Sequence, residues 1–382
     1  MNLDPDPRSE RFRAEVRAWL AASVPDPPLP SVNTAAGFAA HRRWEQSLAA
    51  QRLAAVSWPV RYGGRDAPLA DWLIFEEEYY RAGAPVRVGQ NGLFLLAPRL
   101  FAHGTEEQRD RILAPMATAE QVWAQAWSEP GAGSDLAAIR STATRTDGGW
   151  LLNGQKTWSS RAAFADRAFG LFRSGAPADR HRGLTYLMFD LRVPGVTVRP
   201  IAQLDGDPGF AEIFLDAVFV PDADVIGEPG DGWRIAMSTA SHERGLTLRS
   251  PGRFLAAASR LFELWQRSPS AGLDARVADA WIAARAYQLH TFGTVAALED
   301  AGAAGSPGAR SSLGKVFWSE LDVRLCETAL DLLGPEAELP DRGGPDGDWI
   351  GAYLFSLAGP IYAGTNEIQR SVIAERLLGL PR

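Results

Sequence analysis

Cysteine and lysine are the residues that this sequence has least of. A single cysteine, Cys326, excludes a framework of internal disulfides and suits a reducing compartment. Lys156 and Lys315 are the only lysines, so Schiff-base chemistry has just two candidates. The five histidines are scattered, with no HExxH motif and no cysteine partner at metal-ligand spacing. The sequence therefore predicts no metal site.

Several common catalytic motifs are also missing. The chain has no GxxxxGK[ST] phosphate loop, no GxSxG nucleophile turn and no GxGxxG following a strand. Hydrolase, ATPase and dinucleotide-fold interpretations are disfavoured by these absences.

The sequence also has no long hydrophobic run. No stretch approaches the ~18 apolar residues that a membrane helix requires, and the charged first 30 residues contain no secretory h-region. A net charge of −7 and a pI of about 5.4 disfavour nucleic acid and anionic membranes as partners. We therefore expect a cytoplasmic protein.

The 382 residues are 46% hydrophobic and 22% charged, which is typical of a chain with a large buried core. Apolar residues recur at helical spacing up to about residue 121, and Thr105 with Gln108 has the form of a capping box. The helical period returns from residue 230 to the end. We predict an N-terminal helical domain over 1–121 and a C-terminal helical domain over 230–382.

Between them, residues 122–229 have the character of a β domain. Short β-like runs alternate with Gly, Pro and Asp clusters, which favours a small antiparallel barrel or sandwich. Asp147-Gly148-Gly149 is typical of a hairpin turn, and Asn153-Gly154 has the form of a second tight turn. The predicted fold class is therefore α+β and mainly helical.

Three stretches could carry chemistry. Gln125–Asp135 (QAWSEPGAGSD) combines glycines, which let a backbone approach a flat or phosphorylated ligand, with two neutral hydroxyls. Lys156–Ser160 (KTWSS) places an indole beside hydroxyls. In Tyr362–Arg370 (YAGTNEIQR), a Gly precedes a Thr N-cap, so helix N–H groups would point at a ligand. Taken singly, a turn, a core tryptophan and an ordinary capped helix explain them equally well.

Together, in this order, the three stretches resemble the acyl-CoA dehydrogenase family. The resemblance covers almost the whole chain, and its specific pieces are SEPGAGSD (128–135) and GTNEIQR (364–370). It implies an acyl-CoA dehydrogenase-like fold with a C-terminal four-helix bundle, FAD as cofactor, and assembly as a tetramer.

The resemblance also implies roles for individual residues. The residues that would bind FAD are Gln125, Ser128, Ser134, Trp158, Ser159, Ser160, Thr365 and Glu367. Among them, Ser128 would bond the pyrimidine edge, Trp158 would pack on the ring, and Ser160 would bond N5. The residues that would contact substrate are Ser134, Arg244, Tyr362 and Gly364.

The implied reaction is α,β-dehydrogenation of an acyl-CoA thioester to the trans-2-enoyl-CoA, a step of fatty-acid and lipid β-oxidation. A base takes the α-proton, the β-hydride passes to flavin, and the electrons leave to an electron-transfer flavoprotein. The enolate-like charge on the thioester oxygen needs a donor. The resemblance assigns this role to the backbone N–H of Ala363.

The sequence departs from the family at the base. Many relatives have a Glu immediately before the terminal Gly-Thr, where this chain has Ala363. In family members that lack that Glu, the base stands before an Arg near the start of the C-terminal domain, and Glu243-Arg244 matches that pair. We therefore predict Glu243 as the base. Base placement of this kind resembles isovaleryl-, long-chain and steroid-type members.

Two further departures concern contacts between subunits. The family's Arg-x-x-Phe-Gly clamp on a neighbour's FAD has only weak counterparts, Arg253-Phe254 and His290–Gly293. The family's Gln-x-x-Gly-Gly loop reads Asp331-Leu-Leu-Gly334-Pro335. A homotetramer and a heterotetramer with a related subunit both stay open. So do two other functions: a silent partner subunit, and a flavin monooxygenase or oxidase that uses oxygen.

Overall fold

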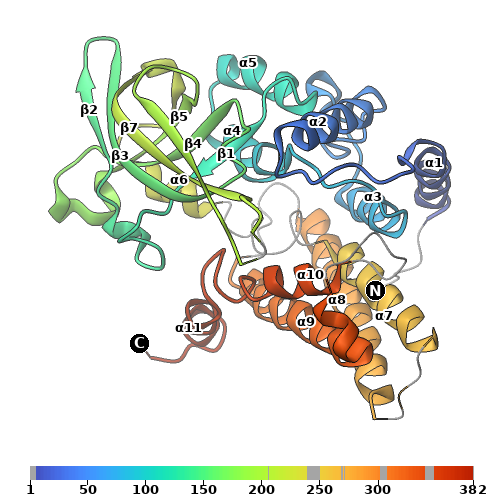
Figure 1. The fold of residues 1–382 in the computed structure, drawn as a ribbon. Helices are drawn as coiled ribbons and strands as arrows, with labels where there is room; N and C mark the ends of the chain where they lie inside the picture. The colour runs from blue at the N-terminus through green and yellow to red at the C-terminus, as the bar shows by residue number, and fades with distance from the viewer. Residues whose placement is uncertain are drawn as a thin grey trace. The chain divides into compact units, whose positions relative to one another are not determined.

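The computed structural model describes residues 6–204, 206–238, 250–267, 270, 272–301, 308–339 and 348–381. The chain divides into two compact units, and each is described by itself. The sheet unit comprises residues 25–66 and 85–240, and the helical unit comprises residues 1–24, 67–84 and 241–382. The order of helical, sheet and helical segments confirms the predicted fold class (Figure 1). The boundaries at residues 121 and 229 stay predictions.

The sheet unit is built on one mixed sheet. Its strands are β1 (Trp123–Ala126), β2 (Thr142–Thr146), β3 (Gly149–Ser160), β4 (Arg167–Arg173), β5 (Leu184–Asp190), β6 (Val196–Ile201), β7 (Phe210–Pro221) and β8 (Val225–Ile226). They lie in the order β6-β7-β3-β2-β4-β5-β8, with β1 on β4.

Most strand pairs are antiparallel, as the sequence predicted. β4, however, pairs in parallel with β1 and, at one position, with β2. Parallel neighbours need a long crossover between them, and here the β2–β3 hairpin lies within that connection. Short-range turn signals do not report such a connection, because it joins residues more than 40 positions apart.

One of the two predicted turns is confirmed and the other is wrong. Thr146 pairs with Gly149, which closes the hairpin at Asp147–Gly149. Asn153-Gly154 is instead a bulge inside β3, where the register against β7 shifts. Gly154 has a φ of +139°, and a Cβ there would lie 2.3 Å from the Ser141 hydroxyl, so this bulge requires glycine.

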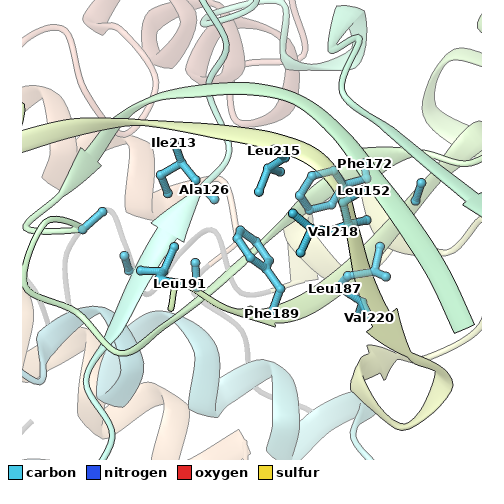
Figure 2. Close-up of a cluster of buried hydrophobic side chains, with 14 of the residues drawn as sticks. Ala126, Leu152, Phe172, Leu187, Phe189, Leu191, Ile213, Leu215, Val218 and Val220 are labelled. Atoms are coloured by element: carbon cyan, nitrogen blue, oxygen red, sulfur yellow. The ribbon is translucent and has the colours of Figure 1, made fainter. Parts of the chain in front are cut away.

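The strands enclose an apolar core, shown in Figure 2. Its members alternate along β3 and β7, as expected when one face of each strand is buried. Several are completely buried, among them Leu152, Phe172, Leu187, Ile213 and Val218. Volume loss in such a core costs ~3–5 kcal/mol for a Phe→Ala change.

Short helices complete the sheet unit. The α-helices are α2 (Ala35–Ala50), α4 (Ala97–His103), α5 (Glu106–Ala117) and α6 (Gly232–Ser238). A π-helical segment, η2 (Asn91–Leu96), leads into α4, and the 3₁₀ turns are η1 (Val60–Tyr62), η3 (Leu136–Ala138), η4 (Pro177–Gly183) and η5 (Asp222–Asp224). The predicted capping box is confirmed, because Thr105 and Gln108 bond each other's backbone N–H.

The helical unit packs long helices around a second core. Its elements are α1 (Pro7–Ser23), α3 (Leu69–Arg81), α7 (Pro251–Arg267), α8 (Asp274–Ala301), α9 (Arg310–Leu333), η8 (Gly334–Glu338), α10 (Trp349–Ser356) and α11 (Asn366–Arg376). α7, α8 and α9 meet around Phe254, Tyr287 and Trp318. No helix among the described residues is both long and apolar enough to cross a membrane.

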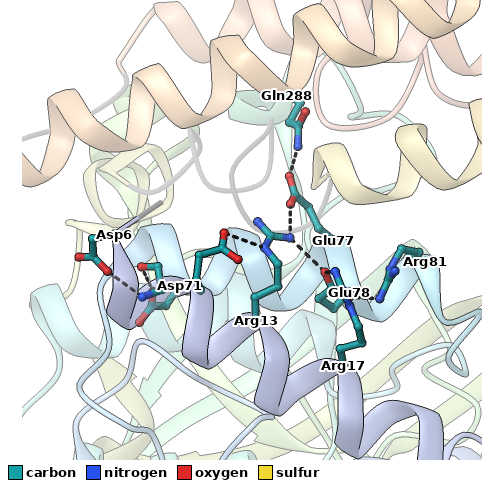
Figure 3. A network of polar contacts seen from close by, with 10 residues as sticks. Asp6, Arg13, Arg17, Asp71, Glu77, Glu78, Arg81 and Gln288 are labelled. Carbon is teal, nitrogen blue, oxygen red and sulfur yellow. Dashed lines mark hydrogen bonds and ion pairs between the residues drawn. The ribbon is translucent and has the colours of Figure 1, made fainter. Parts of the chain in front are cut away.

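Ion pairs join α1 to α3 (Figure 3). Arg13 lies 3.0 Å from Glu77 and 3.1 Å from Glu78, and Arg17 lies 3.0 Å from Glu78. Gln288 on α8 donates to Glu77. The network attaches the N-terminal helix to helices far along the sequence.

Candidate active site

Gln125 lies on β1 and Ser128 just beyond its end, in the sheet unit. The sequence did not predict β1, whose four residues are too few for an alternation to be read. The Gln125 side-chain Nε2 is buried and has no hydrogen-bond partner among the described residues. Such a donor costs free energy unless a ligand supplies the acceptor.

Trp158 and Ser160 lie at a second bulge of β3. The register shifts between Lys156 and Ser159, and Trp158 has a φ of +59°. Its indole is 59% exposed and meets Phe210 edge-on at 6.0 Å. The bulge therefore presents a large aromatic face to the outside of the sheet unit. Ser159 beside it is fully buried, with no hydrogen-bond partner for its Oγ among the described residues.

Ser160 lines a small recess of the sheet unit, together with Gln90, Asn91 and Trp123. Asn91 opens the π-helical segment, and π-helical turns are frequent at functional sites. Since residues from three distant parts of the chain meet here, no local sequence signal could have grouped them.

A buried ion pair fixes the loop after Ser128 to β3. The Lys156 Nζ lies 2.8 Å from Glu129 and also donates to the Leu171 carbonyl at 2.7 Å. Glu129 in turn accepts from the backbone N–H groups of Arg140, at 2.6 Å, and Ser141, at 2.9 Å. One carboxylate thus holds both ends of the glycine-rich loop.

The same loop is joined to β3 by its backbone. The Thr157 N–H donates to the Ser128 carbonyl at 2.9 Å, next to Trp158. The structure therefore brings together two stretches that the sequence singled out separately. Sequence reasoning missed Glu129. A usable signal was Lys156 itself, because the sequence has only one other lysine.

Burial perturbs both members of the pair. Burial lowers the pKa of Lys156 to about 8, against the opposing effect of Glu129. Burial acts to raise the pKa of Glu129, but the Lys156 charge and the hydrogen bonds from Lys156, Arg140 and Ser141 together outweigh it and hold that pKa below its ordinary value. Both groups are therefore charged at neutral pH.

Ser134 stands on the exposed part of the loop. Gly131 and Gly133 beside it are exposed, and nothing lies within 4 Å of the position of a Cβ at either glycine. This open surface leaves room for a ligand.

In the helical unit, the terminal motif forms a left-handed turn before α11. Ala363 has a φ of +56° and Gly364 a φ of +82°. Thr365 is the predicted N-cap, since its hydroxyl accepts from the Ile368 N–H at 3.3 Å. Among the described residues, none accepts a hydrogen bond from the Ala363 N–H. That N–H is thus free to serve a ligand.

Buried polar side chains hold this turn and the start of α11 by hydrogen bonds. Asn366, the first residue of α11, accepts from Lys315 at 2.8 Å and from Ser319 at 3.1 Å. Gln369 is fully buried and donates to the Gly364 carbonyl at 3.2 Å. Asn366 and Gln369 lie in the stretch that the sequence singled out, whereas Lys315 and Ser319 were missed as supports, because α9 lies about 50 residues earlier in the chain.

Gly364→Ala tests the turn. The new Cβ would meet the Gln369 amide at 2.4 Å, and the φ of +82° strains any L-residue by ~1–2 kcal/mol. We expect FAD retention and the rate of flavin reduction by acyl-CoA to fall together. The control is Gly379→Ala, which has a φ of +67° with nothing within 4 Å and should keep both. Equal behaviour of the two variants would contradict a role for this turn.

Tyr362 packs between aromatic rings, at 5.9 Å from Trp318 and 6.3 Å from Phe355. Glu367 is exposed, and hydrogen bonds from its own backbone N–H and from Thr365 lower its pKa. Glu243 and Arg244 lie outside the described residues.

The structure places both weak counterparts of the family's Arg clamp in the helical unit. Arg253 lies 2.8 Å from Asp322 in its own unit and is three-quarters buried. Burial opposes its charge, but Asp322 and the weaker contributions of Tyr362, Tyr80 and Cys326 together outweigh this effect and raise the Arg253 pKa above its ordinary value. His290 lies on the exposed side of α8, and Asp331 of the altered loop pairs with Arg276 at 2.5 Å. Arg253 is thus committed within the subunit.

The residues of both units fit FAD. In the sheet unit, Gln125 offers a buried amide without an acceptor, and Trp158 offers an exposed aromatic face. In the helical unit, the N-terminus of α11 and the Ala363 N–H suit an anionic or carbonyl oxygen. Among the described residues, no cluster of His, Cys, Asp or Glu is arranged to hold a metal ion.

Comparison with known proteins gives matches along nearly the whole chain. Three family models match in succession: acyl-CoA dehydrogenase, N-terminal domain, over residues 6–120; middle domain over 124–218; and C-terminal domain over 230–378. The protein "Acyl-CoA dehydrogenase IpdE1" of Mycobacterium tuberculosis is 40% identical over 98% of each chain.

Solved structures share the fold. One is "Crystal structure of the ChsE4-ChsE5 complex from Mycobacterium tuberculosis", with 28% identity, 100% coverage of both chains and a TM-score of 0.86. Another is "Tcur3481-Tcur3483 steroid ACAD", with 24% identity, 100% coverage of both chains and a TM-score of 0.89.

Proposed function

Because the chain belongs to the acyl-CoA dehydrogenase family, whose cofactor is FAD, we propose that it oxidises an acyl-CoA to the trans-2-enoyl-CoA. The electrons pass to an electron-transfer flavoprotein, and the reaction takes place in the cytoplasm. The observation that carries the proposal is the Ala363 N–H, which stands in a left-handed turn and donates to no described residue. It matches a thioester oxygen on which negative charge develops.

The proposed roles divide by unit. From the sheet unit, Gln125, Ser128, Trp158, Ser159 and Ser160 hold the flavin ring, and Ser134 contacts the ring or the CoA phosphates. From the helical unit, Thr365 and Glu367 hold the adenylate portion. When bound, FAD supplies the acceptor for the two electrons of the β-hydride.

Residues of this chain take the α-proton and donate to the thioester oxygen. Glu243 takes the α-proton, because Ala363 has no side chain able to do so. The Ala363 N–H donates to the thioester oxygen, and Tyr362 and Gly364 line the substrate beside it. Arg244 orients this turn. A base outside the terminal loop leaves room there and favours a branched, bulky or steroid-like acyl group.

We further propose a heterotetramer with a related subunit over a homotetramer. Arg253 is committed to Asp322, so it is not available as the family's clamp on a neighbour's FAD. Similar solved structures include complexes of two different chains by their titles. Exposed apolar side chains on α8 and α9 suit a subunit interface: Trp281, Ile282, Leu289, Leu313 and Phe317.

The function is tested by anaerobic bleaching of the flavin absorbance with a panel of straight, branched and steroid-like acyl-CoAs. We expect bleaching by at least one bulky acyl-CoA, fast reoxidation by electron-transfer flavoprotein and slow reoxidation by oxygen. Fast reoxidation by oxygen would instead indicate an oxidase or monooxygenase.

One alternative function is a catalytically silent partner subunit. Ala363 favours this alternative, since it stands where many relatives have the Glu base. Co-expression with a related subunit, followed by the Glu243→Gln change in this chain alone, separates the two. Unchanged turnover of that complex would assign catalysis to the partner.

A further inference from the structure

Arg99 on α4 carries a buried charge without an acidic partner. Its side chain is fully buried. One terminal nitrogen donates to the Leu95 carbonyl and the other to the Ala236 carbonyl at 3.1 Å, while Nε has no hydrogen-bond partner among the described residues. No carboxylate of the described part of the chain forms an ion pair with it.

Aromatic rings surround this guanidinium. It lies over the Trp127 ring at 5.0 Å and over the Tyr186 ring at 5.6 Å. The Trp127 Nε1 is itself buried with no acceptor among the described residues. The Arg99 Nε, the Trp127 Nε1 and the Nε2 of Gln125, two residues before Trp127, are therefore all buried donors that lack acceptors among the described residues.

An arrangement of this kind is costly for the protein alone. Removing an ion from water is strongly unfavourable unless an opposite charge or a full set of acceptors compensates it. The sheet unit compensates its other fully buried arginine, Arg87, in the ordinary way, with Glu45 at 2.6 Å. Arg99 has aromatic faces and carbonyls instead, so the missing negative charge is expected from a ligand.

Trp127 identifies the ligand. It stands between Gln125 and Ser128, the residues that the proposed function places against the flavin, and our inference rests on that placement. A flavin that gains two electrons and one proton becomes more negative by one charge. We propose that the uncompensated guanidinium of Arg99 stabilises this charge through Trp127 and so raises the reduction potential of the bound FAD.

The alternative is a structural tie, in which Arg99 serves only to hold the carbonyls of Leu95 and Ala236. Two variants separate charge from structure. Arg99→Met removes the charge and keeps an unbranched side chain, whereas Arg99→Lys keeps the charge but loses the forked contact with both carbonyls. Arg87→Met is the matched control, because it removes a buried arginine that has its own carboxylate.

The readouts are the potential of bound FAD, measured by equilibrium with a redox dye, and urea unfolding of the flavin-free protein. In Arg99→Met we expect the ratio of reduced to oxidised flavin at a fixed potential to fall at least ~10-fold, about 30 mV for two electrons. We also expect a higher urea midpoint than wild type without flavin, because a desolvated charge is gone. Arg99→Lys should keep the potential, and Arg87→Met should lower the midpoint without changing the potential.

An unchanged potential in Arg99→Met would overturn the proposal, as would an equal fall in Arg99→Lys. If Arg99→Met does not fold, Arg99→Gln is used; failure of both, with Arg99→Lys folded, would show a structural charge and equally overturn it. The dye titration uses no acyl-CoA. A shifted potential in protein whose flavin no acyl-CoA bleaches would therefore refute the proposed function and leave this inference standing.

Discussion

Glu243→Gln should abolish most of the flavin reduction while leaving FAD bound. The amide has the size of the acid but cannot accept the α-proton, so we expect the rate of reduction by acyl-CoA to fall at least ~100-fold. Acyl-CoA binding should persist, because the proposed donor to the thioester oxygen is the Ala363 N–H, which this change leaves intact. Stopped-flow absorbance under anaerobic conditions measures both quantities.

Two comparisons make the result specific. Glu263→Gln changes an exposed carboxylate of α7 and should leave the rate unchanged. Ala363→Glu in the Glu243→Gln background restores a carboxylate at the family's usual position and should recover part of the rate. Near-normal reduction by Glu243→Gln alone would refute the assignment of the base.

Lys156→Met should lower both the free energy of unfolding and the affinity for FAD. It leaves Glu129 buried without its cation, and breaking a buried pair in this way costs ~3–5 kcal/mol of unfolding free energy. The loop from Glu129 to Ser141 also loses the group that holds its carboxylate. We therefore expect FAD affinity to fall at least ~10-fold, which is ~1.4 kcal/mol. Urea unfolding and flavin fluorescence report the two effects.

A double variant separates the effect on stability from the effect on FAD affinity. Lys156→Met with Glu129→Met replaces the pair by apolar groups, which is often neutral for stability. Stability should recover only in part, because the buried Ser141 N–H loses its acceptor, while FAD affinity stays low because the carboxylate no longer holds the Arg140 and Ser141 N–H groups. The control is Arg145→Met, which breaks an exposed ion pair with Asp222 on the same sheet and should change neither quantity measurably. Recovery of FAD affinity in the double variant would contradict the positioning role.

The Lys156–Glu129 pair also predicts that the free energy of unfolding depends on pH. The pKa of Lys156 is about 8 in the folded protein, against 10.5 for an ordinary lysine. Between these values the unfolded chain binds more protons, so this group makes the unfolding free energy rise with pH. The stability deficit of Lys156→Met should accordingly grow, by on the order of 1–2 kcal/mol between pH 8 and 10. For Glu129, whose pKa is lowered, the contribution is present above the ordinary carboxyl pKa and is lost as the solution becomes more acidic.

Local patterns were sufficient for much of the architecture. Helical spacing, the capping box at Thr105 and the N-cap at Thr365 all depend on residues within four positions of one another. The hairpin at Asp147–Gly149 depends on turn residues in the same way. Such signals are readable from a single sequence, because their physical cause lies within one turn of the backbone.

The candidate site was readable only as separate pieces. The stretches around Ser128, Trp158 and Thr365 were recognisable by their residue types and order, and their resemblance to one family supplied the cofactor. At Asn153-Gly154 the sequence predicts a turn and the structure has a bulge, because the Ser141 side chain that crowds Gly154 is not its neighbour in sequence.

By itself, the sequence determined the fold class, the family and the residue types available for flavin and thioester. Only the tertiary structure decided which charges are compensated. Lys156 finds Glu129, Arg253 finds Asp322, and Arg99 finds no carboxylate among the described residues. The physical reason is that burial and pairing of a charge depend on side chains brought together from distant segments. The free energy of a charge therefore cannot be read from its neighbours in the chain.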